Sequence, residues 1–487
     1  MEKGRLLKTV GASALGVGAL TMSNVSFAEE VKIQKKAPNI VFILTDDQGW
    51  SQVSKHIDPR IINSKSDYLE TPVMDNLADQ GVRFTAGYSP APVCTPTRRS
   101  ILCGTATARS GSEFVSRFVP KEHTTIPRVL KKANPNYMTG HFGKWGKFIG
   151  STPKECGYDV DDGIGTNSTG GQGQSATAYL VDDPKRTSSV TDHAIDFMQK
   201  QVKDNKPFFM QVSYFAVHLR VETLEKTLNK YKAKGAPDRQ YTAGWAAMLE
   251  DLDNGVGRVL KTIDDLKISD NTFVVFMSDN GCQNPHVGGD KSRPQTNHPL
   301  IGAKQSLNEG GIRVPFFVKG PGIKPNSYCH TPVAGYDLLA TFYDFAGGKE
   351  PLPSDVDGAS IMPLLKDPEN GKIKRPLDGL VFHRPCPGGK KGKAGKSIFR
   401  TNDYKLIIKW DNKEEGKIVK RELYNLKSSP VENQETLVSD NNMTQKMETQ
   451  LLAFLKSVNA ETPFNVLGKK DGKKDGKRVR GKKKRKK

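Results

Sequence analysis

The sequence has little cysteine, few acidic residues relative to basic ones, and no second long apolar run. Its six cysteines include no metal-type C-x-x-C pair, which argues against a structural zinc site. Beyond the N-terminal segment, no stretch approaches the roughly 18 apolar residues that a membrane-spanning helix needs. Lys and Arg number 74 against 53 Asp and Glu, a formal net charge of +21, but no nucleic-acid-binding motif accompanies this charge. These absences disfavour zinc-finger, membrane-embedded and nucleic-acid-binding proteins.

The N-terminal segment has the pattern of an export signal. In residues 1–28, three basic residues precede a weakly apolar stretch, and Ser26-Phe27-Ala28 offers small residues for cleavage. We therefore expect a signal peptide over 1–28 and a soluble mature protein exported to the periplasm or the extracellular space. A retained membrane anchor is the alternative interpretation of the same residues.

The C-terminal segment is strongly basic. Residues 468–487 contain thirteen Lys or Arg and two Asp, so they contribute eleven of the formal positive charges. Such a segment is too polar to bury a core, which predicts a disordered basic tail. It is either a solvated tail or a contact to polyanions such as sulfated polysaccharide, anionic envelope or nucleic acid. Export disfavours nucleic acid.

The chain between these ends reads as two domains. Residues 38–375 alternate apolar strand-like runs with helical stretches, which predicts an α/β sandwich around a mainly parallel sheet. The clearest helix is expected at 245–266, because its apolar residues recur at helical spacing. Residues 376–460 predict a smaller domain, with strands at 397–400, 404–410 and 417–426 and a closing helix at 441–458. Residues 163–175 form a Gly/Ser/Thr-rich loop, a connector or a lining of the substrate cleft.

Two of the apolar runs end in oxygen-bearing side chains. Residues 39–45 precede Asp46 and Asp47, and residues 272–278 precede Asp279 and Asn280. Parallel strands that end together would bring these four groups to one edge of the sheet. An all-oxygen cage of this kind suits a hard cation, calcium more readily than zinc. Either acidic pair alone is more typical of a strand-end turn or a helix cap.

A cysteine motif lies between these two segments. Residues 92–104 read P-V-C-T-P-T-R-R-S-I-L-C-G, with Pro96 and Arg98 at fixed offsets from Cys94. Proline is favoured in the first turn of a helix, so Cys94 is expected at a helix N-terminus. Arg98, one turn further on, would point back toward the same pocket. A buried cysteine before an ordinary helix is the alternative.

The motif resembles the C-x-P-x-R signature of the type I, formylglycine-dependent sulfatases of the alkaline phosphatase-like superfamily. The resemblance extends over roughly residues 38–460. It implies an alkaline phosphatase-like α/β sandwich with a large mostly parallel central sheet, plus a small C-terminal α+β subdomain with an antiparallel sheet. It also implies that a formylglycine-generating maturation enzyme oxidises Cys94. The hydrated aldehyde would then share one calcium ion per chain with Asp46, Asp47, Asp279 and Asn280.

Other motifs of the family assign further catalytic residues by the same resemblance. The G-K-W string places Lys144 at the sulfate, and the segment ending in His218 resembles that of a catalytic histidine. Lys304 stands just before 309–315, an E-G-G-x-R-V-P string distinctive of these enzymes. The implied catalytic set is Cys94, Arg98, Lys144, His218 and Lys304.

One family residue is missing. The family reads G-K-W-H, whereas Gly146 follows Trp145 here, so the histidine that by resemblance helps release sulfate is absent. His141 is a poor substitute, because side chains alternate across a strand and it would point opposite to Lys144. His286 and His298 remain alternatives. Cys103, where the family has Thr, is expected to be a small buried side chain.

These patterns lead to the expectation of an exported, calcium-dependent sulfatase that releases sulfate from a sulfated carbohydrate. The sulfated glycan is the expected partner, without nucleic acid and without a membrane span. A phosphonate or phosphodiester hydrolase of the same superfamily is one alternative. A weakly active glycan-binding protein is the other, motivated by Gly146 and the basic tail.

Overall fold

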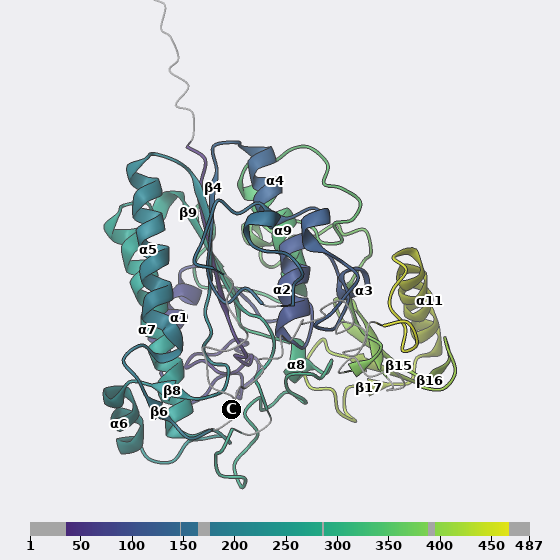
Figure 1. Ribbon diagram of the computed structural model, residues 1–487. Coiled ribbons are helices and arrows are strands. Elements are labelled where there is room, and N and C mark those ends of the chain that lie inside the picture. The colour runs from purple at the N-terminus through teal and green to yellow at the C-terminus, as the bar shows by residue number, and fades with distance from the viewer. Residues whose placement is uncertain (1–35, 147, 164–175, 285–286, 388–394, 467–487) are drawn as a thin grey trace, which may run out of the picture. The chain divides into compact units, whose positions relative to one another are not determined.

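The apolar runs of the sequence form neighbouring strands of one large β-sheet (Figure 1). The computed structural model describes residues 36–146, 148–163, 176–284, 287–387 and 395–466. Within them the sheet has, in spatial order, β11 (Ser327–Cys329), β2 (Val82–Phe84), β10 (Phe316–Lys319), β9 (Thr272–Ser278), β1 (Asn39–Thr45), β7 (Phe208–Ser213), β4 (Met138–Gly143) and β5 (Val160–Asp161).

The sheet is mostly parallel. Strand β1 pairs in parallel with β9 and β7, and β7 pairs in parallel with β4. Only β10 runs the other way in this sheet among the described residues, antiparallel to β9 and β2. The α/β fold class is confirmed, with one antiparallel strand that the apolar pattern does not reveal.

Helices cover both faces of the sheet. One face carries α1 (Pro72–Asp79), α5 (Thr187–Lys203) and α7 (Ala243–Asp265). The opposite face carries α2 (Cys94–Cys103), α4 (Ile126–Ala133), α9 (Leu338–Phe345) and α10 (Met362–Lys366). Shorter elements are β3 (Gly87–Tyr88), α3 (Thr107–Ser110), β6 (Tyr179–Leu180), β8 (Glu222–Thr223), α6 (Glu225–Ala233), α8 (Glu309–Ile312) and β12 (Val333–Ala334).

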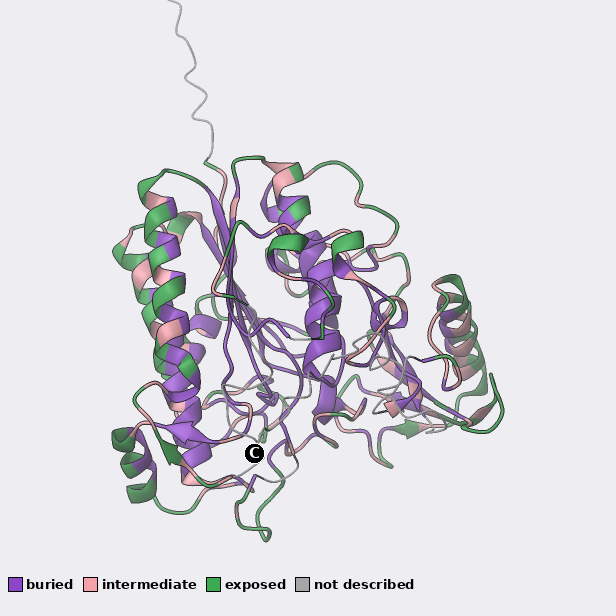
Figure 2. Ribbon diagram, viewed as in Figure 1, coloured by how far each residue is buried: buried purple, intermediate pink, exposed green. Residues whose placement is uncertain are grey.

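Alternation along the strands divides the core into two layers. In β1, Val41 and Ile43 pack with α1, α5 and α7, whereas Ile40, Phe42 and Leu44 pack with α2, α4 and α9. Every residue of β1 is buried, so its apolar run is continuous (Figure 2). The sheet is therefore rigid where its strands end at polar residues.

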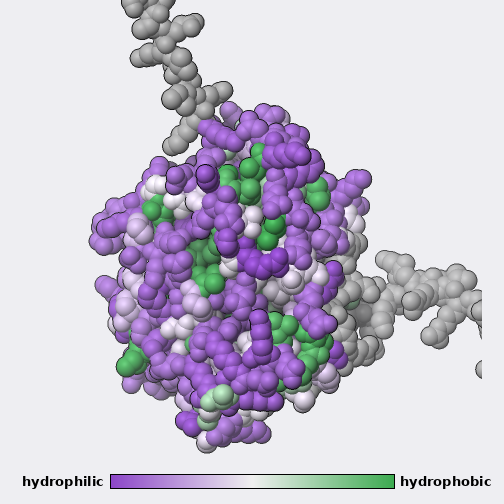
Figure 3. All heavy atoms as spheres, turned by 90° about the vertical axis from the view of Figure 1, so that its left-hand side faces the viewer, coloured by the Kyte–Doolittle hydropathy of each residue, from purple (hydrophilic) through white to green (hydrophobic). Residues whose placement is uncertain are grey.

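The predicted long helix is α7, which begins two residues before the predicted start. Its N-cap is Thr242, whose hydroxyl accepts a hydrogen bond from the Trp245 amide at 3.1 Å. The face of the molecule that carries α5 and α7 is largely hydrophilic with scattered apolar side chains (Figure 3). Both helices bury one side only (Figure 2), as expected for amphipathic helices on a sheet.

The C-terminal part forms a second, antiparallel sheet with one helix. It comprises β13 (Leu380–Arg384), β14 (Lys396–Arg400), β15 (Tyr404–Trp410), β16 (Ile418–Asn425), β17 (Leu437–Val438) and α11 (Asn441–Ser457). The expected strands and closing helix are present, with ends shifted by one residue or less. The domain boundary near residue 376 stays a prediction.

Three predicted segments lie outside the described residues: the signal peptide at 1–28, the loop over 164–175 and the tail at 468–487. Among the helices that the structure describes, none is long and apolar enough to cross a membrane.

Candidate active site and metal centre

The predicted site residues follow the carboxyl ends of four adjacent strands of the large sheet. Asp279 follows β9, Asp46 follows β1, the segment leading to His218 follows β7, and Lys144 follows β4. In register, Thr45 at the end of β1 pairs with Ser278 at the end of β9. The parallel topology therefore explains why residues far apart in sequence meet here.

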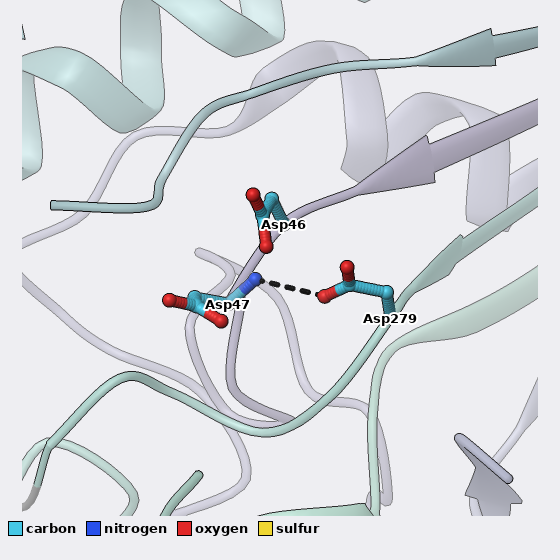
Figure 4. A group of neighbouring side chains, drawn as sticks. All are labelled: Asp46, Asp47 and Asp279. Carbon is cyan, nitrogen blue, oxygen red and sulfur yellow. Dashed lines mark hydrogen bonds between the residues drawn. The ribbon is translucent and has the colours of Figure 1, made fainter. Parts of the chain in front are cut away.

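Three carboxylates form the centre of this site (Figure 4). Asp46, Asp47 and Asp279 each offer an oxygen within 4.8 Å of the others, and all three are buried. The Asp47 amide donates a hydrogen bond to Asp279 Oδ1 at 3.2 Å. Asp47 has a φ of 61°, a left-handed conformation that Asp adopts more readily than most residues. This backbone turn directs both consecutive aspartates into one cluster.

The fourth predicted ligand lies beside them. Asn280 donates an amide hydrogen to Asp47 Oδ1 at 2.7 Å, which leaves its own Oδ1 as a free acceptor. That oxygen and Asp46 Oδ1 are buried and have no hydrogen-bond partner among the described residues. Buried acceptors left without donors are costly, and a hard cation would satisfy both. The donor set therefore fits a divalent cation of the calcium type.

Three cationic side chains surround the carboxylates. Lys144 pairs with Asp46, Lys304 Nζ lies 2.7 Å from Asp47 Oδ1, and Arg98 donates to Asp279 Oδ2 through Nε at 2.9 Å and Nη2 at 2.7 Å. The cluster therefore balances three negative against three positive charges. A divalent cation would leave it net positive, which suits an anionic substrate.

The titration of the carboxylates reflects these pairings. Burial alone would raise the pKa of Asp46, but Lys144, together with His218 and Lys304, outweighs it and lowers the pKa below the usual range. At Asp47, burial favours a higher pKa and Lys304 a lower one, and the pKa is again lowered. At Asp279, burial and the Asp46 charge raise the pKa despite Arg98. Three carboxylates crowded together repel one another, which is a further reason for a cation among them.

The cysteine lies where the proline spacing predicted. Helix α2 begins at Cys94, after Val93 in an extended conformation, and Cys94 is buried. Arg98 reaches back from the next turn, and its Nη1 donates to the Lys144 carbonyl at 2.6 Å. The Lys304 loop is tied to the same place, because the Gln305 amide donates to the Pro92 carbonyl at 2.7 Å. Cys94 thus shares the neighbourhood of the carboxylates and lysines.

His218 lies at the open side of the cluster. Its Nε2 is 3.8 Å from Asp47 Oδ2, and its Nδ1 is 2.6 Å from the Leu219 carbonyl oxygen. A carbonyl only accepts, so Nδ1 carries the hydrogen and Nε2 is the nitrogen available for proton exchange. Burial lowers the pKa of His218, and the Asp47 charge opposes that effect.

The E-G-G-x-R-V-P string packs its backbone closely against the segment that carries the predicted metal ligands Asp279 and Asn280. It forms α8 and its exit, and the Gly281 amide donates to the Gly311 carbonyl at 3.0 Å. A Cβ at Gly281 would lie 2.0 Å from the Gly310 carbonyl oxygen, so only glycine fits next to Asn280. Sequence reasoning missed Asn297, whose side-chain amide donates to the carbonyls of Gly302 and Gly310. No sequence signal marks it, because it lies in an irregular loop.

The histidine alternatives differ in position. His141 is buried with its ring edge-on to Trp145 and Tyr158, and burial lowers its pKa to about 3. It is therefore neutral and packed away from Lys144, as strand alternation predicts. Among the described residues no hydrogen bond or ion pair joins His298 to the cluster, and its backbone carbonyl accepts a hydrogen bond from the Ser51 hydroxyl. His286 lies outside the described residues. Cys103 is buried, as expected.

Gly146 occupies a backbone conformation that a histidine would strain. Its φ is 115°, and a Cβ built there would lie 3.3 Å from Ile149 Cδ1 and 3.8 Å from Thr95 Oγ1. L-residues with positive φ pay roughly 1 to 2 kcal/mol. A histidine at position 146 would therefore also require a different backbone conformation at this position.

Gly146→Ala is expected to lower the free energy of unfolding by about 1 to 2 kcal/mol or more, measured by urea denaturation. Gly235→Ala is the matched control, because Gly235 has a φ of 93° with nothing within 4 Å of its Cβ position. The difference between the two variants measures the contact with Ile149. Gly146→His is expected to lose stability without faster sulfate release, and a stable, faster variant would contradict this account.

Fold and site together define an α/β protein of the alkaline phosphatase-like class, with a buried cysteine at a helix N-terminus and a carboxylate cluster at the ends of parallel strands. The Sulfatase family profile matches residues 38–348, and the profile described as N-sulphoglucosamine sulphohydrolase, C-terminal, matches residues 301–461. The chain belongs to the sulfatase family and is a sulfuric ester hydrolase.

Individual relatives agree with this assignment. A sulfatase of Formosa agariphila is 27% identical, covering 91% of this chain and 93% of the relative. An ulvan-active sulfatase of the same organism is 28% identical, over 75% of this chain and 72% of its own length. The crystal structure of Ps i-CgsB in complex with k-i-k-neocarrahexaose superposes with a TM-score of 0.67 at 24% identity, covering 90% of this chain and 96% of that one.

Proposed function

We propose that this sulfatase releases sulfate from a sulfated carbohydrate, with residue 94 as nucleophile and one calcium ion in the carboxylate cluster. The observation that carries the proposal is the pair of orphaned buried oxygens, Asp46 Oδ1 and Asn280 Oδ1, in a cluster next to the N-terminus of α2. The carbohydrate class is supported by similarity to an ulvan-active sulfatase.

The cysteine and the cation have complementary roles in this proposal. After oxidation to formylglycine by a maturation enzyme, residue 94 would supply a hydroxyl whose pKa is lowered by a cation bound to Asp46, Asp47, Asp279 and Asn280. A thiol is a soft ligand and a carboxylate cluster prefers a hard cation, so an oxygen at residue 94 fits this site better than sulfur. The partial positive charge at the start of α2 also favours an anionic nucleophile.

The lysines bind the sulfate. Lys144 and Lys304 each pair with one aspartate, so their ammonium groups are fixed in position before substrate enters. Preorganised donors of this kind contribute about 2.7 to 4 kcal/mol each to transition-state stabilisation. Arg98 acts through Asp279 and the Lys144 carbonyl, and keeps both in place.

His218 donates the proton to the departing alcohol. Its Nδ1 is committed to the Leu219 carbonyl, so the transferred proton is held at Nε2. Asp47, 3.8 Å away, stabilises the doubly protonated ring. His218 protonates the leaving oxygen at the outer side of the cluster while Lys144 and Lys304 hold the sulfate at the inner side.

The remaining expectations concern the chain ends. We propose that residues 1–28 direct export to the periplasm or beyond, and that residues 468–487 contact polyanions such as the substrate polysaccharide. The net positive charge of the whole chain supports the second point. A truncation after residue 467 that binds sulfated polysaccharide at low salt as tightly as the full chain would overturn it.

The function is tested by a sulfate-release screen over sulfated glycans, using protein co-expressed with a maturation enzyme. We expect release from at least one glycan, loss of that release on chelation of divalent ions, and recovery with added calcium. Because the cation binds only the folded state, calcium at 100 times its Kd is expected to add about 2.7 kcal/mol of stability. Differential scanning calorimetry of stripped and refilled protein measures this.

The same samples separate the alternatives. Faster hydrolysis of an aryl phosphonate than of an aryl sulfate would indicate that a phosphonate ester, and not a sulfate ester, is the substrate. Sugar binding without sulfate release from fully converted protein would indicate a glycan-binding protein. Undiminished activity after removal of all divalent ions would contradict the metal site.

A further inference from the structure

A cavity of about 390 Å³ adjoins the Lys304 side of the site. One wall is the loop of residues 303–307, and the other is formed by Arg384 and Lys396 from the C-terminal sheet. Lys304 borders both this cavity and Asp47. The cavity is therefore next to the place where the sulfate is held, and the two sheets build it together.

The cavity wall is cationic. Arg384 at the end of β13 and Lys396 at the start of β14 lie directly opposite each other in register. Like charges at such positions destabilise a sheet. Arg384 is compensated by Glu113 at 2.8 Å, whereas among the described residues the Lys396 ammonium has no ion pair and donates to the Asn308 side-chain oxygen at 3.2 Å, with Glu432 and Glu422 acting on it from a greater distance. No Asp or Glu lines the cavity among the described residues.

The row of cations continues outward across the sheet. Lys396 pairs in register with Lys409 on β15, and Lys409 pairs with Lys420 on β16. Paired residues lie on the same face of a sheet, so Arg384, Lys396, Lys409 and Lys420 form one line, here called the cationic ladder. Lys409 and Lys420 are exposed. Lys420 is compensated by Glu422 at 2.7 Å, whereas the repulsion between Lys396 and Lys409 would be relieved by a bound polyanion.

We propose that the cavity binds a second anionic group of the substrate and that the cationic ladder guides the adjoining glycan chain. The proposal rests on the function proposed above and specifies the substrate class, a glycan with anionic groups on successive sugars. Lys304 borders both sites, so the two innermost groups belong to the same or neighbouring sugars. The second group is a sulfate or a carboxylate, since both present the oxygens that Arg and Lys recognise.

Lys396→Met tests the cavity, because it removes the charge and keeps an apolar side chain of similar length. Its kcat/KM for a tetrasaccharide sulfated on every unit is expected to fall about 10- to 100-fold, the range for a lost hydrogen bond to a charged group. The loss is expected in KM, whereas hydrolysis of a monosulfated monosaccharide changes less than about twofold. Lys396→Arg is expected to restore most of the difference.

Two further variants complete the design. Lys409→Met, at the exposed part of the ladder, is expected to raise KM for the tetrasaccharide by a smaller factor. Lys446→Met is the control, because Lys446 is an exposed lysine on α11 outside the ladder. Two kinds of tetrasaccharide are compared: one carries only sulfates, and the other carries one sulfate together with uronate carboxylates. The kind whose KM depends on Lys396 identifies the anionic group that the cavity binds.

The outcomes separate this inference from the proposed function. If wild-type protein hydrolyses none of these sulfate esters, the proposed function fails. The cavity is then tested by binding alone, and tetrasaccharide that binds Lys396→Met as tightly as wild type would overturn the anion site. If wild type is active and Lys396→Met keeps its KM for the tetrasaccharide, the cavity is not an anion site. An equal loss on the monosaccharide, with an unchanged unfolding temperature, would also overturn the proposal, since the charge would then act on the cleaved sulfate.

Discussion

Protein with Cys94→Ala is expected to release no measurable sulfate while keeping its fold. The alanine side chain cannot be oxidised to an aldehyde, so no hydroxyl can be generated at the N-terminus of α2. Loss of the nucleophile in enzymes of covalent mechanism costs on the order of 10⁶-fold in kcat. Cys94 is buried at a helix start that Pro96 stabilises, so the helix itself does not depend on the thiol.

Cys103→Ala is the matched control, since Cys103 is the buried cysteine at the other end of the same helix. Its loss removes one sulfur from the apolar layer and is expected to cost about 1 kcal/mol of stability with activity retained. Mass spectrometry of the peptide that carries residue 94 identifies the active form. Active material with an unmodified Cys94 thiol would contradict the proposed nucleophile.

Much of the site could be predicted because the chemistry lies at strand ends. The apolar runs before Asp46 and Asp279 identify buried strands, and parallel topology brings their ends together. The spacing of Cys94 and Pro96 predicted the start of α2. In these places the local pattern and the tertiary structure require the same residues.

Other features depend on tertiary contacts that no local pattern encodes. The run containing β10 is as apolar as β9, and apolarity does not distinguish a parallel from an antiparallel strand. The φ of Gly146 follows from its loop and not from the G-K-W string. The cationic ladder depends on strand register, and each of its lysines alone resembles an ordinary surface residue.

A buried ionic cluster joins the C-terminal sheet to the segment that supports the metal ligands. Lys405 on β15 is fully buried, and its Nζ lies 2.7 Å from Glu309 and 2.8 Å from Glu432. Glu309 begins α8 and also accepts from the Tyr88 hydroxyl at 2.8 Å and from Arg313 at 3.2 Å. Lys405 therefore pairs with two carboxylates from different parts of the chain, and it shares Glu309 with Arg313.

Lys405→Met is expected to lower the free energy of unfolding by about 3 to 5 kcal/mol, because it leaves the buried Glu432 without its ion-pair partner and Glu309 with Arg313 alone. Urea denaturation at pH 7.5 measures the loss. Lys409→Met, four residues further along the same strand and exposed, is the control and is expected to change stability by less than about 0.5 kcal/mol. A loss of similar size in both variants would show that the cluster contributes no specific stabilisation.

The pH dependence of the Lys405→Met deficit distinguishes an uncompensated charge from lost packing. In the wild type, burial raises the pKa of Glu309 but Lys405, Arg313 and Arg400 together outweigh it and lower the pKa, whereas at Glu432 burial prevails and the pKa is raised. Without Lys405, the pKa of both carboxyl groups is expected to rise, and that of Glu432 to lie further above its unfolded value, so the folded variant binds more protons than the unfolded chain at Glu432. Its stability then rises as the pH falls through the folded pKa values toward the unfolded ones. The deficit relative to wild type is therefore expected to shrink between pH 8 and pH 5, whereas a packing defect would leave it constant.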